Sequence, residues 1–183
     1  MVADQFARLG CVVINADRLN HEVLARPEVI QQLVEWWGAA ILDEVGVLSR
    51  RAVGRIVFDD PEQLKRLTSL VHPLVIVREK ELLATYQGQC DVRGIVLDVP
   101  LLYEVGQDRW CDAVVFVSTE ASIRLERVAR ERGWTSGQLK KVENSQIALD
   151  KKAQAADYTV YNNSDISSVR VQVERIFKQL SRA

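Results

Sequence analysis

The most informative absence in these 183 residues is a glycine-rich phosphate-binding loop. Neither G-x-x-x-x-G-K-[ST] nor G-x-G-x-x-G occurs, and the whole sequence holds only 9 glycines. Through these two motifs, backbone N–H groups commonly cradle the phosphates of a nucleotide. The sequence by itself therefore offers no ready-made phosphate cradle.

The sequence also has few cysteines and a net charge close to zero. The three cysteines, Cys11, Cys90 and Cys111, are odd in number and lack the spacing of a metal site. This excludes a disulfide framework or a zinc knuckle and fits a reducing compartment. The formal net charge is −1, so no large basic field for nucleic acid exists, and any anion site must be local.

A secretory leader and a membrane-spanning segment are missing as well. Met1 to Gln5 do not form a basic start followed by an apolar core, and no apolar run reaches the roughly 20 residues of a transmembrane helix. The hydrophobic fraction of 48% and the charged fraction of 27% are ordinary for a globular protein with a core. We therefore expect a cytoplasmic protein that binds neither membrane nor nucleic acid. Its oligomeric state is not indicated.

Four short apolar runs predict the strands. They lie at residues 11–14, 94–99, 113–117 and 158–161 and are separated by segments of helical periodicity. This alternation predicts an α/β protein with a parallel sheet. Residues 18–88 are nearly all helical, which is too much for one crossover and indicates a helical insertion.

Within that insertion, a helix is expected to begin at Asp60-Pro61, which combine an N-cap with a proline at the first helical position. We expect it to break at His72-Pro73, because proline disfavours helical geometry in the preceding residue. A further helix is predicted from about Leu74 to Tyr86.

Two of the predicted strands end in a carboxylate, Asp17 after the first and Asp98 in the second. Ligands of open α/β sheets lie at the carboxyl ends of strands, where a carboxylate can take a proton from a hydroxyl or hold magnesium. The alternative for Asp17 is a capping role at the next helix. For Asp98 the alternative is a solvated loop acid.

Cationic residues concentrate after the third strand. An arginine-rich helix and the lysines that follow it could bind phosphate oxygens, since the planar guanidinium binds them in bidentate fashion. A solvated charged face is the alternative. For the two histidines, a structural role for His72 and a surface or packing role for His21 are the alternatives to function. The cations are Arg124, Arg127, Arg130, Arg132, Lys140, Lys141, Lys151 and Lys152.

Several segments, taken together, resemble the motifs of the dephospho-coenzyme A kinase family in order and spacing. They cover essentially the whole chain, and their combination is specific although each is weak. They are Val13-Ile14-Asn15-Ala16-Asp17 with His21-Glu22-Val23, Leu48-Ser49-Arg50-Arg51-Ala52, Val57-Phe58-Asp59-Asp60-Pro61, Leu70-Val71-His72-Pro73-Leu74, Asp98-Val99-Pro100-Leu101-Leu102-Tyr103-Glu104, and Ala156-Asp157-Tyr158 to Asn162-Asn163.

The resemblance implies a P-loop NTPase fold of the nucleotide-kinase type. A nucleotide-binding core would comprise residues 1–17, 89–118 and 157–183. Residues 18–88 would form a helical substrate domain and residues 119–156 a helical lid. The implied reaction transfers the γ-phosphoryl group of ATP, with Mg²⁺, to the ribose 3′-hydroxyl of dephospho-CoA, the last step of coenzyme A synthesis.

The resemblance also implies roles for particular residues. Asp17 matches the family's proton-accepting aspartate, and Asn162 matches an asparagine near the adenine end of the nucleotide site. In the lid the family's arginine aligns with Glu131, so its neighbours Arg127 and Arg130 are the candidates for phosphate contact. The substrate-side positions are His72, Pro73, Asp98, Pro100, Leu101 and Leu102.

Two departures from the family pattern limit this identification. By the motif alignment, Met1 follows directly on the family's phosphate-binding loop, so the first, central strand and that loop are expected to be missing. Asn15 stands where the family usually has aspartate. We expect either a truncated sequence with a wrongly assigned start or a genuine short and inactive chain. Alternative functions are another P-loop nucleotide kinase and a non-catalytic α/β module that binds a CoA-like ligand.

Overall fold

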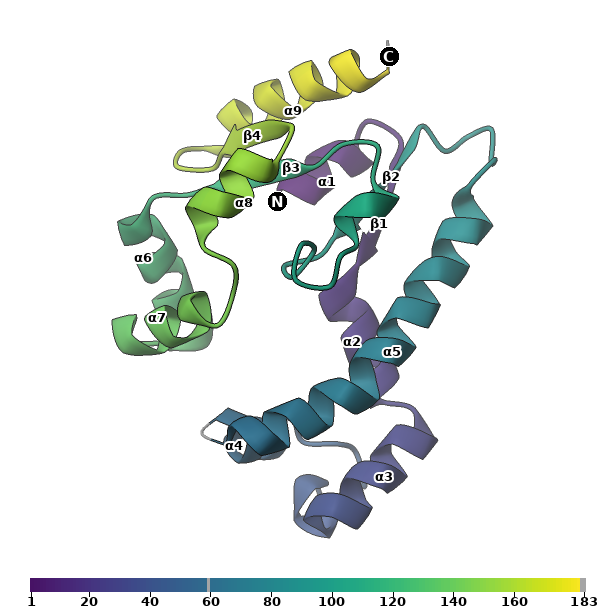
Figure 1. The fold of residues 1–183 in the computed structure, drawn as a ribbon, viewed down its shortest axis with the longest axis vertical. Helices are drawn as coiled ribbons and strands as arrows, with labels where there is room; N and C mark the ends of the chain where they lie inside the picture. The colour runs from purple at the N-terminus through teal and green to yellow at the C-terminus, as the bar shows by residue number, and fades with distance from the viewer. Residues whose placement is uncertain (59, 182–183) are drawn as a thin grey trace. The chain divides into compact units, whose positions relative to one another are not determined.

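A computed structural model describes residues 1–58 and 60–181, and these form two compact units (Figure 1). The central unit is Ile14–Asp98; the terminal unit combines Met1–Val13 with the chain from Val99 onward. Asp59, one residue of the motifs quoted above, lies outside the described residues. The division into core, substrate domain and lid stays a prediction.

The central unit is almost entirely helical. Its helix α5 is the longest in Figure 1 and packs against α2 and α4. The elements of this unit, together with β1, which leads into it, are β1 (Cys11–Asn15), α2 (Ala16–Leu24), α3 (Pro27–Trp37), a 3₁₀ turn (Ala39–Ile41), α4 (Arg50–Phe58), α5 (Pro61–Tyr86) and β2 (Gly94–Asp98).

Helix α5 runs through the position where a break was predicted, so that prediction is wrong. Pro73 lies inside the helix, where its missing N–H and its ring cost about 3 kcal/mol. The compensation is a single buried stripe of Val71, Val75 and Glu79 at successive four-residue steps. Packing of that continuous face against the core overrides the local preference. The start of α5 is as expected, because the Asp60 carboxylate accepts hydrogen bonds from the backbone N–H groups of the first turn.

The terminal unit carries the remaining strands and helices. In it, α9 packs against both α1 and β4. Its elements are α1 (Val2–Ala7), a 3₁₀ turn (Asp108–Trp110), β3 (Val115–Ser118), α6 (Ala121–Arg132), α7 (Ser136–Asn144), α8 (Leu149–Ala155), β4 (Tyr158–Tyr161) and α9 (Ile166–Leu180).

The four predicted strands all form, and the α/β class is confirmed, but the expectation of one sheet needs correction. In the described residues the strands make two separate pairs, β1–β2 and β3–β4. The second pair is parallel, with Val115 opposite Tyr158 and Ser118 opposite Tyr161. No described strand pairs with members of both, and apolar runs predict strands without specifying which strands lie side by side.

Each unit has its own apolar core. In the central unit, Ile14 of β1 belongs to one buried cluster with Val23, Leu33 and Ile41, all at most 2% exposed. In the terminal unit the buried side chains include Val160 of β4 and Val173 and Phe177 of α9. Among the described helices, none joins the length to the apolar character that crossing a bilayer would require.

Candidate active site

Asn15 joins three elements at one edge of the central unit. It is the last residue of β1, and its side-chain Oδ1 accepts a hydrogen bond from the backbone N–H of Arg18 at 2.8 Å. Its Nδ2 donates to Oδ2 of Asp98, the last residue of β2, at 2.6 Å. The ends of both strands and the start of α2 are therefore fixed by one amide.

This geometry separates the roles of Asn15 and Asp17. The cap of α2 is Asn15, so the capping alternative considered for Asp17 does not apply. Asp17 lies in the first turn of α2 with an exposed side chain, where the helix dipole favours a negative charge. Within residues 1–58 and 60–181 its carboxylate makes no hydrogen bond or ion pair, which leaves its oxygens available to a hydroxyl.

Asn15→Asp tests the junction, since the variant keeps the cap but replaces the donor to Asp98 with a second carboxylate. We expect a loss of about 1 kcal/mol in the free energy of unfolding at pH 7, the interaction of two unit charges about 4 Å apart in water. Repulsion raises the pKa of one carboxylate, so the loss should shrink as the pH falls toward 4. Urea titrations at several pH values measure this, with Asn15→Ser as the uncharged control. A pH-independent loss would contradict it.

A second polar pair lies one helical turn further along α2. Nη1 of Arg50, the first residue of α4, lies 2.6 Å from Nε2 of His21. Because guanidinium only donates, Nε2 is the acceptor and the ring carries its proton on Nδ1. His21 follows Asp17 by four residues and so shares its helix face, which brings Arg50 toward that face. The sequence predicts a surface or packing role for His21, and no local pattern indicates a partner 29 positions away.

His72 and Pro73 are exposed on α5. Within the parts of the chain that the structure describes, no hydrogen bond or ion pair joins His72 to Asn15, Asp17 or Asp98. The structure therefore brings Asp98 to the start of α2 but does not link His72 to that junction.

The other predicted substrate-side residues lie in the terminal unit, in the loop after β2. Pro100 is exposed, and Leu101 and Leu102 are half-buried. Nζ of Lys152 donates to the carbonyl oxygen of Pro100 at 3.1 Å and lies 2.7 Å from Oε1 of Glu104. Lys152 is thus a buried partner of this loop, and neither of its predicted roles, a phosphate-binding cation or part of a solvated charged face, fits it.

The Glu104 carboxylate is charged in this setting. Its burial would raise the pKa, but the hydrogen bond from Lys152 and one from the backbone N–H of Ile147 outweigh burial and hold the pKa of Glu104 below its usual value. Burial raises the pKa of the neighbouring Tyr103 phenol, with Asp108 and Asp157 adding to the shift.

The arginines of α6 differ in what they already bind. Nε of Arg124 pairs with Glu143 of α7 at 2.9 Å, Arg130 lies 3.6 Å from Glu131, and the guanidinium of Arg132 lies 5.0 Å from the centre of the Trp134 ring. Arg127 makes no hydrogen bond, ion pair or ring contact with any residue that the structure describes. Of the two lid candidates, Arg127 is therefore the more available to phosphate, while Arg130 shares its charge with Glu131.

Asn162 follows β4, and its backbone N–H donates to the carbonyl oxygen of Ser118 at 2.7 Å. Its side chain is only 9% exposed, and no described residue donates to its buried Oδ1. A buried amide oxygen without a donor costs about 1–3 kcal/mol. It is suited to accept a hydrogen bond from a ligand, such as a purine amino group.

Few of the described side chains are placed to coordinate magnesium. The described residues contain no cluster of three His, Cys, Asp or Glu side chains that could hold a metal ion. Mg²⁺ on a nucleotide usually takes one or two carboxylates together with phosphates and water. Asp98, which has one oxygen left after its bond to Asn15, and Asp17 fit that mode.

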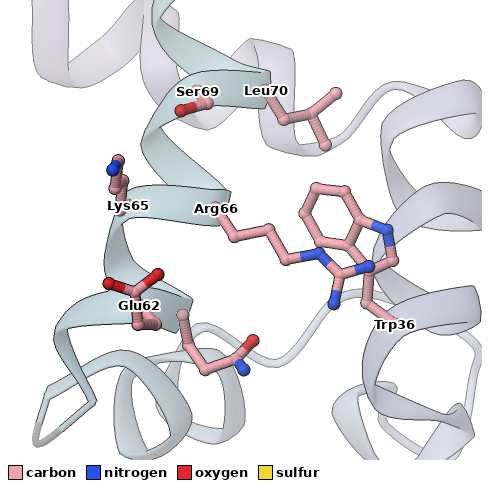
Figure 2. A pocket seen from close by; sticks show the side chains of 7 residues that line it. Trp36, Glu62, Lys65, Arg66, Ser69 and Leu70 are labelled. Carbon is pink, nitrogen blue, oxygen red and sulfur yellow. The ribbon is translucent and has the colours of Figure 1, made fainter.

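The central unit also has a pocket whose lining contains none of the predicted site residues (Figure 2). The guanidinium of Arg66 stacks 4.0 Å from the centre of the Trp36 ring, and Lys65 is a second cation in the lining of the pocket. The neighbouring Trp37 donates from Nε1 to Oε1 of Gln63 at 2.7 Å. The pocket is lined by Trp36, Glu62, Gln63, Lys65, Arg66, Ser69 and Leu70.

Parallel strands, a helical insertion and polar side chains at strand ends define the class, the α/β fold of the P-loop NTPases. Two solved structures share this fold. One is TT1252 from Thermus thermophilus, with a TM-score of 0.77 and 26% identity, over 98% of this chain and 90% of that one. The other is dephospho-CoA kinase from Campylobacter jejuni, with a TM-score of 0.68 and 21% identity, over 99% of this chain and 90% of that one.

Within that class, the chain belongs to the dephospho-CoA kinase family, whose model matches residues 1–168. It is 35% identical to a dephospho-CoA kinase of Leptospira interrogans over 176 residues, which are 94% of this chain and 82% of that protein. It is 30% identical to a dephospho-CoA kinase of Fusobacterium nucleatum over 174 residues, 95% of this chain and 88% of that protein. The resemblance noted from the motifs is confirmed.

Proposed function

We propose that this chain binds dephospho-CoA and supplies side chains for the transfer of the γ-phosphoryl group of ATP to the ribose 3′-hydroxyl, in the cytoplasm, a reaction that these residues alone carry out only weakly. The observation that carries the proposal is the Asn15 junction, which fixes Asp98 beside the helix turn that bears the free carboxylate of Asp17. In the reaction, Asp17 accepts the proton of the 3′-hydroxyl and the oxygen attacks the γ-phosphorus. The bond from that phosphorus to the β–γ bridging oxygen breaks, and ADP leaves.

The remaining predicted residues take supporting roles in this proposal. Arg127, with Arg130, balances charge on the transferring phosphoryl group, and Asn162 accepts a hydrogen bond from the adenine amino group. Phosphoryl transfer depends mainly on such positioning and charge stabilisation. Magnesium, when bound with ATP, would neutralise phosphate charge beside Asp98 and Asp17. Contacts to the acceptor come from His72, Pro73, Asp98, Pro100, Leu101 and Leu102.

The missing phosphate cradle sets a limit on the activity of these residues. With no G-x-x-x-x-G-K-[ST] run, the 183 residues lack the backbone N–H groups and the lysine that hold the β- and γ-phosphates. We propose that they bind Mg-ATP poorly and have little kinase activity. Isothermal titration with Mg-ATP tests this, and a micromolar affinity would overturn it.

Ligand-dependent thermal stability should separate the acceptor from the nucleotide. At 100 times its Kd a ligand adds about 2.7 kcal/mol to stability, which raises Tm by about 5–10 °C in a chain of this size. We expect that shift with dephospho-CoA and little change with Mg-ATP. Other nucleoside and nucleotide acceptors are the controls.

Stabilisation by several unrelated acceptors would favour another nucleotide kinase. No stabilisation by dephospho-CoA would contradict the proposal. Stabilisation by dephospho-CoA with no phosphoryl transfer from labelled ATP would leave the non-catalytic, CoA-binding module as the function of these residues.

A further inference from the structure

Lys152 is the only lysine that the structure buries among its described residues, with 7% of the residue exposed. It lies on α8, and its Nζ reaches two groups of the loop after β2, the carbonyl oxygen of Pro100 at 3.1 Å and Oε1 of Glu104 at 2.7 Å. The same Oε1 accepts the backbone N–H of Ile147, two residues before α8 begins, at 2.9 Å. Two side chains therefore bind the segment 147–152 to the loop at three points.

The loop itself is folded as a series of tight turns. The backbone N–H groups of Val105 and Gln107 donate to the carbonyl oxygens of Leu101 and Leu102 at 3.1 and 2.9 Å. Gly106 has a φ of 68°, a conformation that side-chain-bearing residues rarely adopt, and a Cβ there would lie 2.8 Å from Nη2 of Arg109. These bonds shape the loop from 101 to 107 but do not reach Pro100. The Lys152 bond fixes the peptide that precedes Leu101.

A buried ammonium is a poor choice for stability alone. Replacing a buried ion pair with apolar side chains of similar volume is often neutral or stabilising, since the ions pay for their desolvation. An ammonium can direct several hydrogen bonds at once, and here it fixes a backbone carbonyl and a carboxylate in one geometry. The arrangement thus determines where the Pro100 peptide lies, which an apolar side chain could not do.

We propose that Lys152, through Glu104 and the Pro100 carbonyl, is a positioning residue for the acceptor-binding loop. The pair sets the course of residues 100–104 and so the placement of Leu101 and Leu102 against dephospho-CoA. It also links that loop to segment 147–152, which follows α7, so that the two segments keep one relative arrangement. The choice of ligand rests on the proposed function; the effect on the loop does not.

The test compares four versions of the whole chain, each titrated with dephospho-CoA at a temperature well below its own Tm. They are the unaltered chain, Lys152→Met, the double variant Lys152→Met/Glu104→Leu, and Lys151→Met. The double variant removes the pair without leaving a buried charge, so it separates folding from positioning. Lys151→Met is the matched control, because Lys151 is the exposed neighbour on the same helix. Amide exchange of residues 99–107 is measured on the same samples without ligand.

We expect the single and double variants both to lose about 10- to 100-fold in affinity, the size of effect seen when a supporting partner around a site is removed. Exchange in the loop should accelerate in both, whereas Lys151→Met should show the loop exchange of the unaltered chain. Unaltered affinity and loop exchange in the folded double variant would overturn the inference. If the unaltered chain does not bind dephospho-CoA, the proposed function fails, and loop exchange alone then decides: acceleration supports the positioning role and no change overturns it.

Discussion

Lys152→Met is expected to lower the free energy of unfolding by about 3–5 kcal/mol at pH 7, the usual cost of removing one partner from a buried ion pair. The side chains of Lys152 and Glu104 are 8% and 19% exposed, so little water can replace the lost ammonium around the carboxylate. Glu104 keeps the N–H of Ile147, but its Oε2 is already buried without a donor. Denaturant titration followed by circular dichroism measures the change.

The loss should depend on pH because the pKa of Glu104 changes with its partner. In the unaltered chain that pKa lies below its ordinary value of 4.5, so the charged carboxylate contributes stability above about pH 4.5, and this contribution is lost as the pH falls through the lowered pKa. In Lys152→Met burial dominates and raises the pKa of Glu104. Protonation of Glu104 then removes the unpaired charge that destabilises the variant. The difference between the two proteins should therefore narrow from pH 7 toward pH 4.

Two variants control for this prediction. Lys151→Met should stay within about 0.5 kcal/mol of the unaltered chain, as surface substitutions usually do. The double variant Lys152→Met/Glu104→Leu should recover much of the loss, because it leaves no unpaired charge. A Lys152→Met variant as stable as the control at pH 7 would show that the pair is not buried in solution.

Local signals were sufficient for most of the fold. Apolar runs predicted all four strands, and the cap at Asp60 forms as expected. These features depend on a few neighbouring residues, and so the sequence displays them directly.

What the sequence could not supply depends on contacts between distant segments. The continuity of α5 through Pro73 follows from the core that Val71 and Val75 face, and no local pattern reports that core. The separation into two strand pairs likewise depends on which strands lie side by side. The position of Asp98 at a strand end predicted that it belongs to a site. The hydrogen bond that it accepts from Asn15, 83 positions earlier, is visible only in the structure.

Charge patterns were the weakest guide to individual roles. Lys151 and Lys152 are adjacent and chemically identical, yet one is exposed and the other is buried against Glu104. Likewise, the four arginines of α6 share one pattern but have different partners. A sequence gives the number of cations available to a phosphate, whereas the fold determines which of them are already bound.

The core of the central unit provides the second large effect, since its buried cluster reaches the residue before Asn15. Leu33 of α3 is fully buried in the same cluster as Ile14, the residue before Asn15. Leu33→Ala should cost about 2–5 kcal/mol, the range for leucine truncation in packed cores, where a cavity adds to the lost transfer free energy. Urea denaturation gives the cost, and amide exchange should accelerate within residues 14–98.

Leu64→Ala is the matched control for Leu33→Ala, because Leu64 is 46% exposed on α5 and its truncation leaves no cavity. It should change the free energy of unfolding by about 0.5 kcal/mol or less. If Leu33→Ala accelerates exchange equally in β3–β4 and α9, the two units unfold together; if the effect is confined to residues 14–98, each core stabilises its own unit. A loss no larger than that of the control would contradict the burial of Leu33 in the core of the central unit.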